Sequence, residues 1–305
     1  MPTWMENLQG LLGADVDWKQ VVLMVMTPLF LAGFAIEWKV MRARGTLRQF
    51  EWRDILANLT LGGAYQVFEL AAHALVTGGA VLWFWQHRLF DIPVNAWTIV
   101  PIFVGVEFCY YWFHRTSHRV RWFWSAHVVH HSSERMNMTT AMRQSLLYSV
   151  TGWWLFFMPL VVLGVHPGVV FLLYACDLAY QFFIHTEVVG KLHPWIEYVF
   201  DTPSNHRVHH GRNDEYIDRN YGGVLIVFDR WFGTYAEEDA PVEYGIVRQV
   251  RSTNLLVLNF HEFVDMWKDV LLYGPRHLWM PPEWRKQQPA DPDTLYRRTI
   301  AAPGP

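Results

Sequence analysis

Residues 127–131 have the sequence HVVHH, and residues 206–210 have the related sequence HRVHH. A shorter pattern, HxxxH, precedes them at residues 114–118. Positions i, i+3 and i+4 of a helix share one face, so the imidazoles of each group should point at one spot. Neutral imidazole is a ligand for zinc, copper, iron or nickel. The pattern therefore predicts a metal site built from His114, His118, His127, His130, His131, His206, His209 and His210.

The number of these histidines indicates how many ions the site holds. Eight ligands exceed the six positions of an octahedral ion, so we expect two metals. His185 is a ninth predicted ligand, because it follows the last long apolar run of the chain. The isolated histidines are interpreted as surface or hydrogen-bonded core residues: His73, His87, His166, His261 and His277.

The rest of the chain has the composition of a membrane protein with a large polar part. It is 52% apolar and 16% aromatic, and it contains 17 Trp, a residue that favours membrane interfaces. A mean hydropathy of +0.06 is too low for spans alone. Runs of about 20 apolar residues suffice to cross a bilayer. We expect four to five transmembrane helices near residues 21–37, 55–76, 94–113, 146–163 and 168–184, with a chain break at residues 77–79 and an interfacial segment at 81–90.

Basic residues predict the orientation. Residues 38–54 hold five Lys or Arg, and residues 114–145 hold five Arg. The positive-inside rule puts these segments in the cytoplasm and the N-terminus outside. The predicted fold is an all-α integral membrane protein whose domain, residues 1–240, carries a cytoplasmic histidine-rich cap (residues 114–145 and 185–240) that holds a dimetal centre. Residues 241–305 would be a cytoplasmic tail, irregular from Pro281 onward.

Four carboxylates accompany the histidines. Glu107 shares a helix face with His114, and Asp177 lies eight residues before His185. A carboxylate inside a span is costly and indicates function. Glu134 and Glu187 closely follow predicted ligands. We interpret all four as candidates to orient ligands or to transfer protons, and for Glu134 and Glu187 the roles of metal ligand and of solvated charge stay open as well. The formal charge of −3 gives no indication of a nucleic-acid partner.

Several segments resemble the fatty acid hydroxylase and sterol desaturase superfamily, and within it the bacterial relatives of the alkylglycerol monooxygenase branch. The resemblance is dense over residues 100–235 and rests on EFCYYWFH (107–114), HHSSE (130–134), AMRQS (141–145), IHTE (184–187), TPSNHRVHHGRN (202–213) and NYGGVLIVFDRWFGT (220–234).

The resemblance implies a non-haem di-iron oxygenase that uses O2 to hydroxylate a lipid, and it implies iron as the metal of the eight box histidines. Zinc could replace iron in purified protein, since imidazole discriminates weakly. The resemblance also implies a bacterial inner-membrane location. Tetrahydrobiopterin is the reductant of the alkylglycerol branch. Because Arg119 stands where animal members have Glu, ether cleavage and pterin use are left open.

The reductant is expected to be a separate protein or small molecule, because the sequence has no CxxxxC cluster and no GxGxxG strand–helix unit. Three other interpretations remain. A desaturase would use the same centre, a zinc hydrolase would activate water, and a metal transporter would place its ligands near the bilayer midplane.

Overall fold

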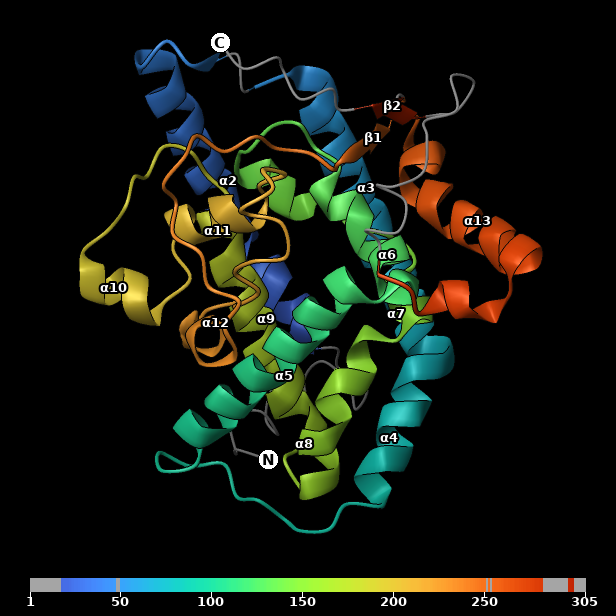
Figure 1. The fold of residues 1–305 in the computed structure, drawn as a ribbon. Helices are drawn as coiled ribbons and strands as arrows, with labels where there is room; N and C mark the ends of the chain where they lie inside the picture. Colours follow the sequence, from blue (N-terminus) through green and yellow to red (C-terminus); the bar gives the residue numbers. More distant parts are fainter. Residues whose placement is uncertain (1–17, 48–49, 251, 253, 282–295, 299–305) are drawn as a thin grey trace.

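The computed structural model describes residues 18–47, 50–250, 252, 254–281 and 296–298. These residues are mostly helical, with one antiparallel pair of short strands (Figure 1). The helices are α2 (Trp18–Ala43), α3 (Trp52–Ala72), α4 (Gly78–Gln86), α5 (Ile99–Arg119), α6 (Arg121–His131), α7 (Tyr148–Thr151), α8 (Met158–Leu163), α9 (Pro167–Ile184), α10 (Pro194–Val199), α11 (Pro203–His209), α12 (Val227–Phe232) and α13 (Leu255–Tyr273); the strands are β1 (Arg248–Val250) and β2 (Tyr296–Arg298).

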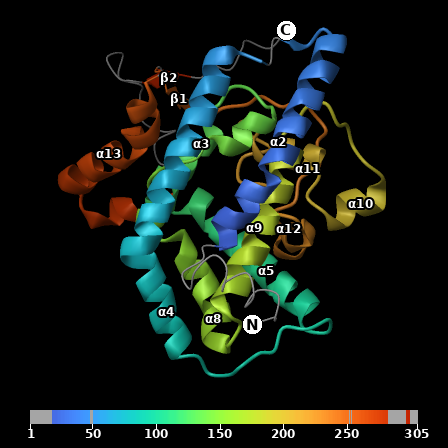
Figure 2. The ribbon, with the colours of Figure 1, turned by 180° about the vertical axis from the view of Figure 1, so that it is seen from behind.

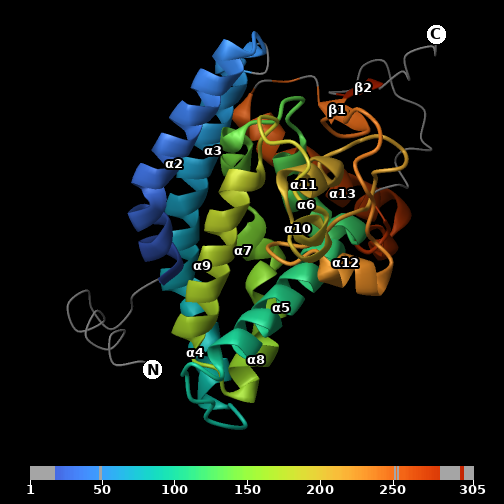
Figure 3. The ribbon, with the colours of Figure 1, turned by 90° about the vertical axis from the view of Figure 1, so that its left-hand side faces the viewer.

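The long apolar helices and the histidine-rich elements occupy different sides of the molecule. Helices α2, α3 and α9 stand beside one another, and α6 and α10 to α13 gather on the opposite side (Figure 3). Viewed from behind, α2 and α3 form the front of the molecule (Figure 2). Only 6% of the most apolar part of α2 is buried within the protein, which leaves this helix an apolar outer surface.

Three helical runs in the described part of the chain are long and apolar enough to cross a membrane: Trp18–Ala43, Trp52–Gln86 and Pro167–Ile184. They contain the predicted spans at 21–37, 55–76 and 168–184, which supports the prediction of an integral membrane protein. The N-terminal residues 1–17, whose side was predicted from charge, lie outside the described residues.

The predicted break at residues 77–79 is wrong, and most of the segment 81–90 that was expected to follow it continues the same helix. The helix continues from Trp52 to Gln86, because a π-helical turn at His73–Thr77 carries it past the two glycines. A Cβ on Gly78 would lie 2.7 Å from the carbonyl oxygen of His73, so glycine fits this wider turn where a larger residue would not.

Two further expected spans differ in the structure. The segment 94–113 becomes α5, which begins at Ile99 and continues through the first histidine pair to Arg119. The segment 146–163 is not one helix but three short pieces. It is interrupted at Gly152, whose φ of +91° is left-handed and favours glycine, and it restarts with Pro159 in the first turn of α8. The expectation of four to five spans is therefore reduced to three candidates.

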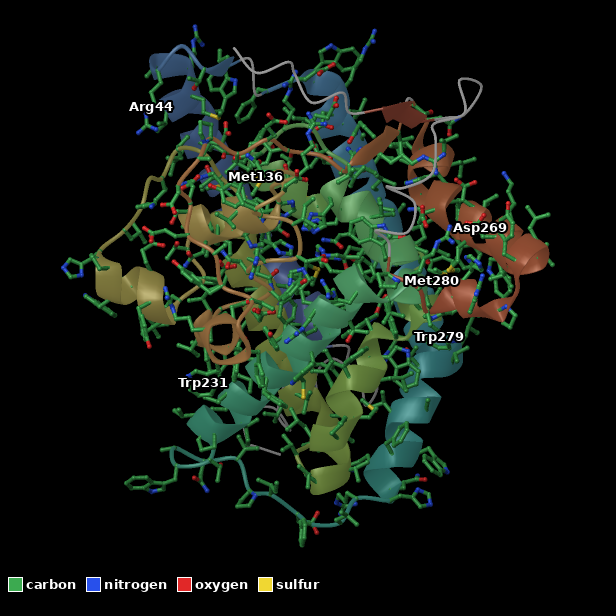
Figure 4. All side chains as sticks on the ribbon, viewed as in Figure 1. Arg44, Met136, Trp231, Asp269, Trp279 and Met280 are labelled. Atoms are coloured by element: carbon green, nitrogen blue, oxygen red, sulfur yellow. The ribbon has the colours of Figure 1, made fainter. Side chains whose placement is uncertain are left out.

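The predicted tail after residue 240 contains a docked helix. Helix α13 packs against α6, and Arg121 of α6 forms buried ion pairs with Glu262 and Asp269 of α13 at 2.8 Å and 2.7 Å. Figure 4 labels Asp269 on this helix. The segment expected to be irregular from Pro281 falls almost wholly on residues 282–295 and 299–305, which lie outside the described part of the chain.

Buried polar contacts tie the apolar helices to the cap. Glu37 of α2 accepts hydrogen bonds from the Met138 backbone N–H, at 2.9 Å, and from the Thr186 hydroxyl. Arg143 joins α3 to the end of α6, since it donates to Asn58 at 3.0 Å and to the Val129 carbonyl at 3.1 Å. Satisfied groups of this kind hold two elements in one relative position, because breaking them leaves a buried polar group unpaired.

The Arg121 ion pairs generate a stability prediction. Replacing Arg121 with Met should leave Glu262 and Asp269 buried without a cation, at a cost of about 3–5 kcal/mol. The thermal unfolding midpoint of the detergent-purified protein should then fall by roughly 5 °C or more. The matched control is Asp91→Asn, which breaks the exposed Arg88–Asp91 pair and should change stability by at most about 1 kcal/mol. An unchanged midpoint in the Arg121 variant would contradict the assignment.

Candidate metal centre

All nine predicted histidine ligands converge in the structure, and they form two groups. The ligand nitrogens in each group lie within 4.8 Å of one another, and every member is buried. Cluster A consists of His114, His118, His127, His131 and His209, and cluster B consists of His130, His185, His206 and His210. His185, which was predicted from its place after an apolar run, lies in cluster B. The isolated histidines at 73, 87, 166, 261 and 277 belong to neither cluster.

The HxxHH boxes do not point at one spot, as the spacing suggested, but divide between the clusters. The pair His127 and His131, four residues apart on α6, belongs to cluster A, while His130 points into cluster B. In the third box, His206 and His210 belong to cluster B, and His209 belongs to cluster A. Residues four apart share a helix face, whereas adjacent residues point about 100° apart, so each HH doublet serves both clusters.

Local sequence fixes the helices that carry these side chains. The Thr202 hydroxyl accepts a hydrogen bond from the Asn205 backbone N–H and caps α11, and Pro203 occupies its first turn. His114 and His118 lie in the last two turns of α5, and the two remaining boxes occupy α6 and α11 with its C-cap. His185 is the C-cap of α9. Four helices therefore deliver the nine imidazoles.

The outer nitrogens of the rings are held by oxygen atoms. The Nδ1 of His114 lies 2.9 Å from the Tyr221 carbonyl, and that of His185 lies 2.6 Å from the Gln181 carbonyl. The Nδ1 of His209 faces a carbonyl oxygen as well, at 3.0 Å. Carbonyl oxygens only accept, so these Nδ1 atoms carry the proton and leave the Nε2 lone pair for another partner.

The inner nitrogens face one another. In cluster A the Nε2 of His127 lies 3.0 Å from that of His114 and 3.1 Å from that of His131. In cluster B the Nε2 of His185 lies 3.0 Å from that of His206 and 3.2 Å from that of His210. Two nitrogens that each lie about 2.1 Å from one ion, at right angles, are about 3.0 Å apart, so this spacing fits ligands of a common ion.

Burial keeps these rings neutral, as metal ligands must be. It lowers the pKa of His209 to about 4, and it lowers the pKa values of His127, His131 and His206 well below the usual value, with neighbouring imidazoles adding to the effect. Neutral rings whose Nδ1 protons point outward present several lone pairs to each other, which is unfavourable without a cation between them. The donor set therefore fits two metal ions, five imidazoles for one and four for the other.

The four predicted carboxylates fall into two kinds. Glu107 and Asp177 are buried beside each other behind the clusters, and Glu107 accepts hydrogen bonds from the backbone N–H groups of Val224 and Leu225 at 2.7 Å and 3.0 Å. Glu107 thereby fixes the chain just after Tyr221, whose carbonyl holds His114. The Asp177 carboxylate accepts from Gln181, the residue whose carbonyl holds His185.

Glu134 and Glu187 lie elsewhere. Glu134 is exposed and lines a second cavity with Arg53 and Arg135, and neither acid belongs to a histidine cluster. Burial raises the pKa of the half-buried Glu187, which hydrogen-bonds to Tyr244. These two positions are thus separate from the converging imidazoles.

Two residues that contact the ligands were missed by sequence reasoning. The Asp201 carboxylate lies 2.9 Å from Nδ1 of His206, and the Tyr148 hydroxyl lies 2.6 Å from Nδ1 of His127. Asp201 precedes its histidine by five residues, outside the i+3 and i+4 spacing, and Tyr148 lies in the segment expected to be an unbroken span. Neither position carried a pattern that pointed to the site.

An apolar cavity of about 560 Å³ reaches both clusters, because its walls include His127, His130 and His185. Its other walls come from α2, α3, α5 and α9, among them Met24, Leu70, Phe113, Leu178 and Phe182. Helix α2 packs mainly along α9, α3 packs against the segment Met138–Met142, and residues of both α2 and α3 line the cavity. Met24 and Leu70 are both exposed at its rim.

Comparisons with known proteins agree with this geometry. Residues 99–234 match the family model described as "Fatty acid hydroxylase". The chain is 44% identical over 188 residues to alkylglycerol monooxygenase of Homo sapiens, which covers 61% of this chain and 42% of that protein. It is 33% identical over 246 residues to the Caenorhabditis elegans protein of the same name, covering 78% and 47%.

A bacterial relative is also similar: ornithine lipid hydroxylase OlsE of Rhizobium tropici, 30% identical over 158 residues, covering 51% of this chain and 47% of that protein. The chain thus spans about half the length of the curated relatives it matches. No solved structure matches it. The matched segment contains all nine converging histidines, and the predicted resemblance is confirmed: residues 99–234 match the family model of the fatty acid hydroxylases.

Proposed function

We propose that this protein is a membrane-bound non-haem di-iron oxygenase that uses O2 to hydroxylate a lipid. The observation that carries the proposal is the apolar cavity, which joins the surface of the candidate spans to both histidine clusters. A hydrolase acting on polar substrates has no use for such a route, whereas an enzyme that oxidises a lipid chain requires one. The named relatives, which are lipid monooxygenases and hydroxylases, support the same reaction class.

The nine imidazoles would hold the two ions, five in cluster A and four in cluster B. Two iron ions bound there would supply O2 activation and insertion of one oxygen atom into a C–H bond. The reaction consumes two electrons and two protons, and the second oxygen atom leaves as water. An external donor must therefore supply the electrons. A reduced pterin or a separate redox protein would meet this need.

The protein's own residues position the ligands and exclude water. Asp201 and the carbonyls of Tyr221 and Gln181 fix the ring orientations, because a histidine whose Nδ1–H is held presents Nε2 in one direction. Around the cavity, Phe113, Leu178 and Phe182 make an apolar wall. A C–H bond held against such a wall reacts without competing attack on water.

The cytoplasmic orientation remains a proposal supported by charge. Arg44, beyond the end of α2, donates to the Val188 carbonyl at 2.8 Å, so the basic end of this helix lies against the cap (Figure 4). The segments that hold the histidines and the segment that holds most of the early basic residues are therefore on one side, which the positive-inside rule assigns to the cytoplasm.

The two-cluster arrangement predicts separable metal losses. His131→Ala should remove a ligand of cluster A and His210→Ala a ligand of cluster B, so each should lower bound metal from about two ions per chain toward about one. Both variants should lose lipid oxidation, measured as the lipid product heavier by one oxygen atom. Elemental analysis of purified protein measures the metal.

The control is His193→Ala, since His193 is exposed and outside both clusters. It should keep full metal content and activity. If both cluster variants retained two ions and oxidised lipid at the wild-type rate, the proposed centre would be wrong.

The Asp201–His206 contact gives a second test. Asp201→Ala should lower metal affinity or activity by about 10–100-fold, because His206 loses the group that orients its ring. Asp201→Asn keeps an oxygen acceptor and should recover much of that loss. The measurement is iron affinity by competition with a chelator, together with the rate of oxygen consumption. Equal behaviour of the Ala variant and the wild type would show that Asp201 has no orienting role.

A further inference from the structure

The apolar cavity is elongated, and its two ends differ. Its wall on α9 runs from Tyr174 to His185, a rise of about 16 Å at 1.5 Å per residue. One end is lined by His127, His130 and His185, together with Ala141 and Gln144. The opposite end is formed by Tyr174 and Trp153. A chain lying along the cavity therefore meets the clusters at one end and aromatic rings at the other.

The rings at the closed end are packed together. Trp153 stacks on Tyr174 with ring centroids 4.8 Å apart and an interplanar angle of 24°. Both side chains are buried, and Tyr65 on α3 completes this wall. We call Trp153, Tyr174 and Tyr65 the floor of the cavity.

A buried ion pair fixes the floor from behind. The Lys19 ammonium lies 3.0 Å from the Glu69 carboxylate, 3.3 Å from the Tyr65 hydroxyl and 4.7 Å above the Trp153 ring. The Trp153 indole N–H donates to Glu69 at 3.1 Å, and the Ser149 hydroxyl donates to the same carboxylate. Every charged group here is engaged, so the floor offers ring surface rather than a site for a polar head group.

A separate, much smaller cavity lies behind the floor. It has a volume of about 20 Å³, and Trp153 lines it together with Lys19, Glu69 and Phe171. Trp153 lines both spaces, so its indole is the part of the floor that lies between them. Truncating the indole would join them.

From this geometry we infer that Trp153 is the residue that sets chain length: a lipid chain enters between α2 and α3 with its methyl end on the floor, and the fixed distance from floor to clusters selects the chains that react. The inference rests on the proposed lipid hydroxylase function. Carbons near the polar end of the lipid would then lie at the histidines. Which carbon reacts would depend on its distance along the chain from the methyl end.

The placement of the chain can be tested without turnover. The protein is reconstituted in phosphatidylcholine nanodiscs that contain a phosphatidylcholine with a diazirine at the acyl-chain terminus, and labelled peptides are mapped by mass spectrometry after illumination. The expected labels fall on Trp153, Tyr174 and Val21. A probe with its diazirine next to the carbonyl should instead label the region of Ala141 and Gln144. The reverse pattern, or labelling confined to the outer surface, overturns the inference even if the protein oxidises lipid.

Selectivity is tested with Trp153→Ala in competition between shorter and longer chains of one lipid class. Because the variant cavity accommodates additional methylenes, the preference should shift toward the longer chain, both in protection from photolabelling and in product yield. Leu155→Ala, in the same turn but exposed, should leave the preference unchanged. Because Trp153→Ala could fail to fold, Trp153→Phe is the second variant: it keeps a ring and should show a smaller shift in the same direction.

An unchanged chain-length preference in a folded Trp153 variant overturns the inference. Absence of lipid oxidation in the wild-type protein, with terminal labelling still on the floor, contradicts only the proposed reaction. The two failures are therefore distinguishable.

Discussion

The rest of the structure depends on the convergence of buried, neutral imidazoles whose lone pairs face one another at about 3 Å. Nothing in the protein interior balances such an arrangement except a cation, so the fold around it needs rigid supports. The carbonyls of Tyr221 and Gln181, the carboxylate of Asp201 and the carboxylate of Glu107 supply them. These contacts fix the orientations of the imidazole rings, and the apolar helices supply the other walls of the cavity.

Buried polar contacts also connect the candidate membrane helices α2 and α3 to the cap. Glu37 on α2 binds a backbone N–H of the cap, and Arg143 joins α3 to the end of α6. Charged residues in or near a span are expensive, and here they link the two parts of the protein. This also changes the interpretation of the basic residues at 114–145, since Arg121 and Arg143 are buried in contacts with acids and amides rather than free to set orientation.

Sequence reasoning found eight of the nine histidines because helical spacing is a strong local signal, and it found His185 from its place after an apolar run. The sequence could not show which histidine belongs to which cluster, because this depends on contacts between distant segments. His130, for example, meets His185, 55 residues away, in cluster B. Local patterns also failed where backbone geometry overrode composition: glycines 78 and 79 stay inside a helix through a π-turn, and Gly152 interrupts an apolar run that reads as a span. Asp201 and Tyr148 act through tertiary contacts alone, so no spacing identified them.

The HH doublets have a consequence for how the two clusters are placed relative to each other. Because α6 and α11 each send adjacent residues to different clusters, the separation of the two clusters is fixed by two short helices rather than by loops. The two helices together therefore hold the clusters at a fixed distance from each other. An insertion of a single residue between the first histidine and the doublet of either helix would rotate the doublet by about 100° relative to that histidine, and would displace ligands of both clusters at once.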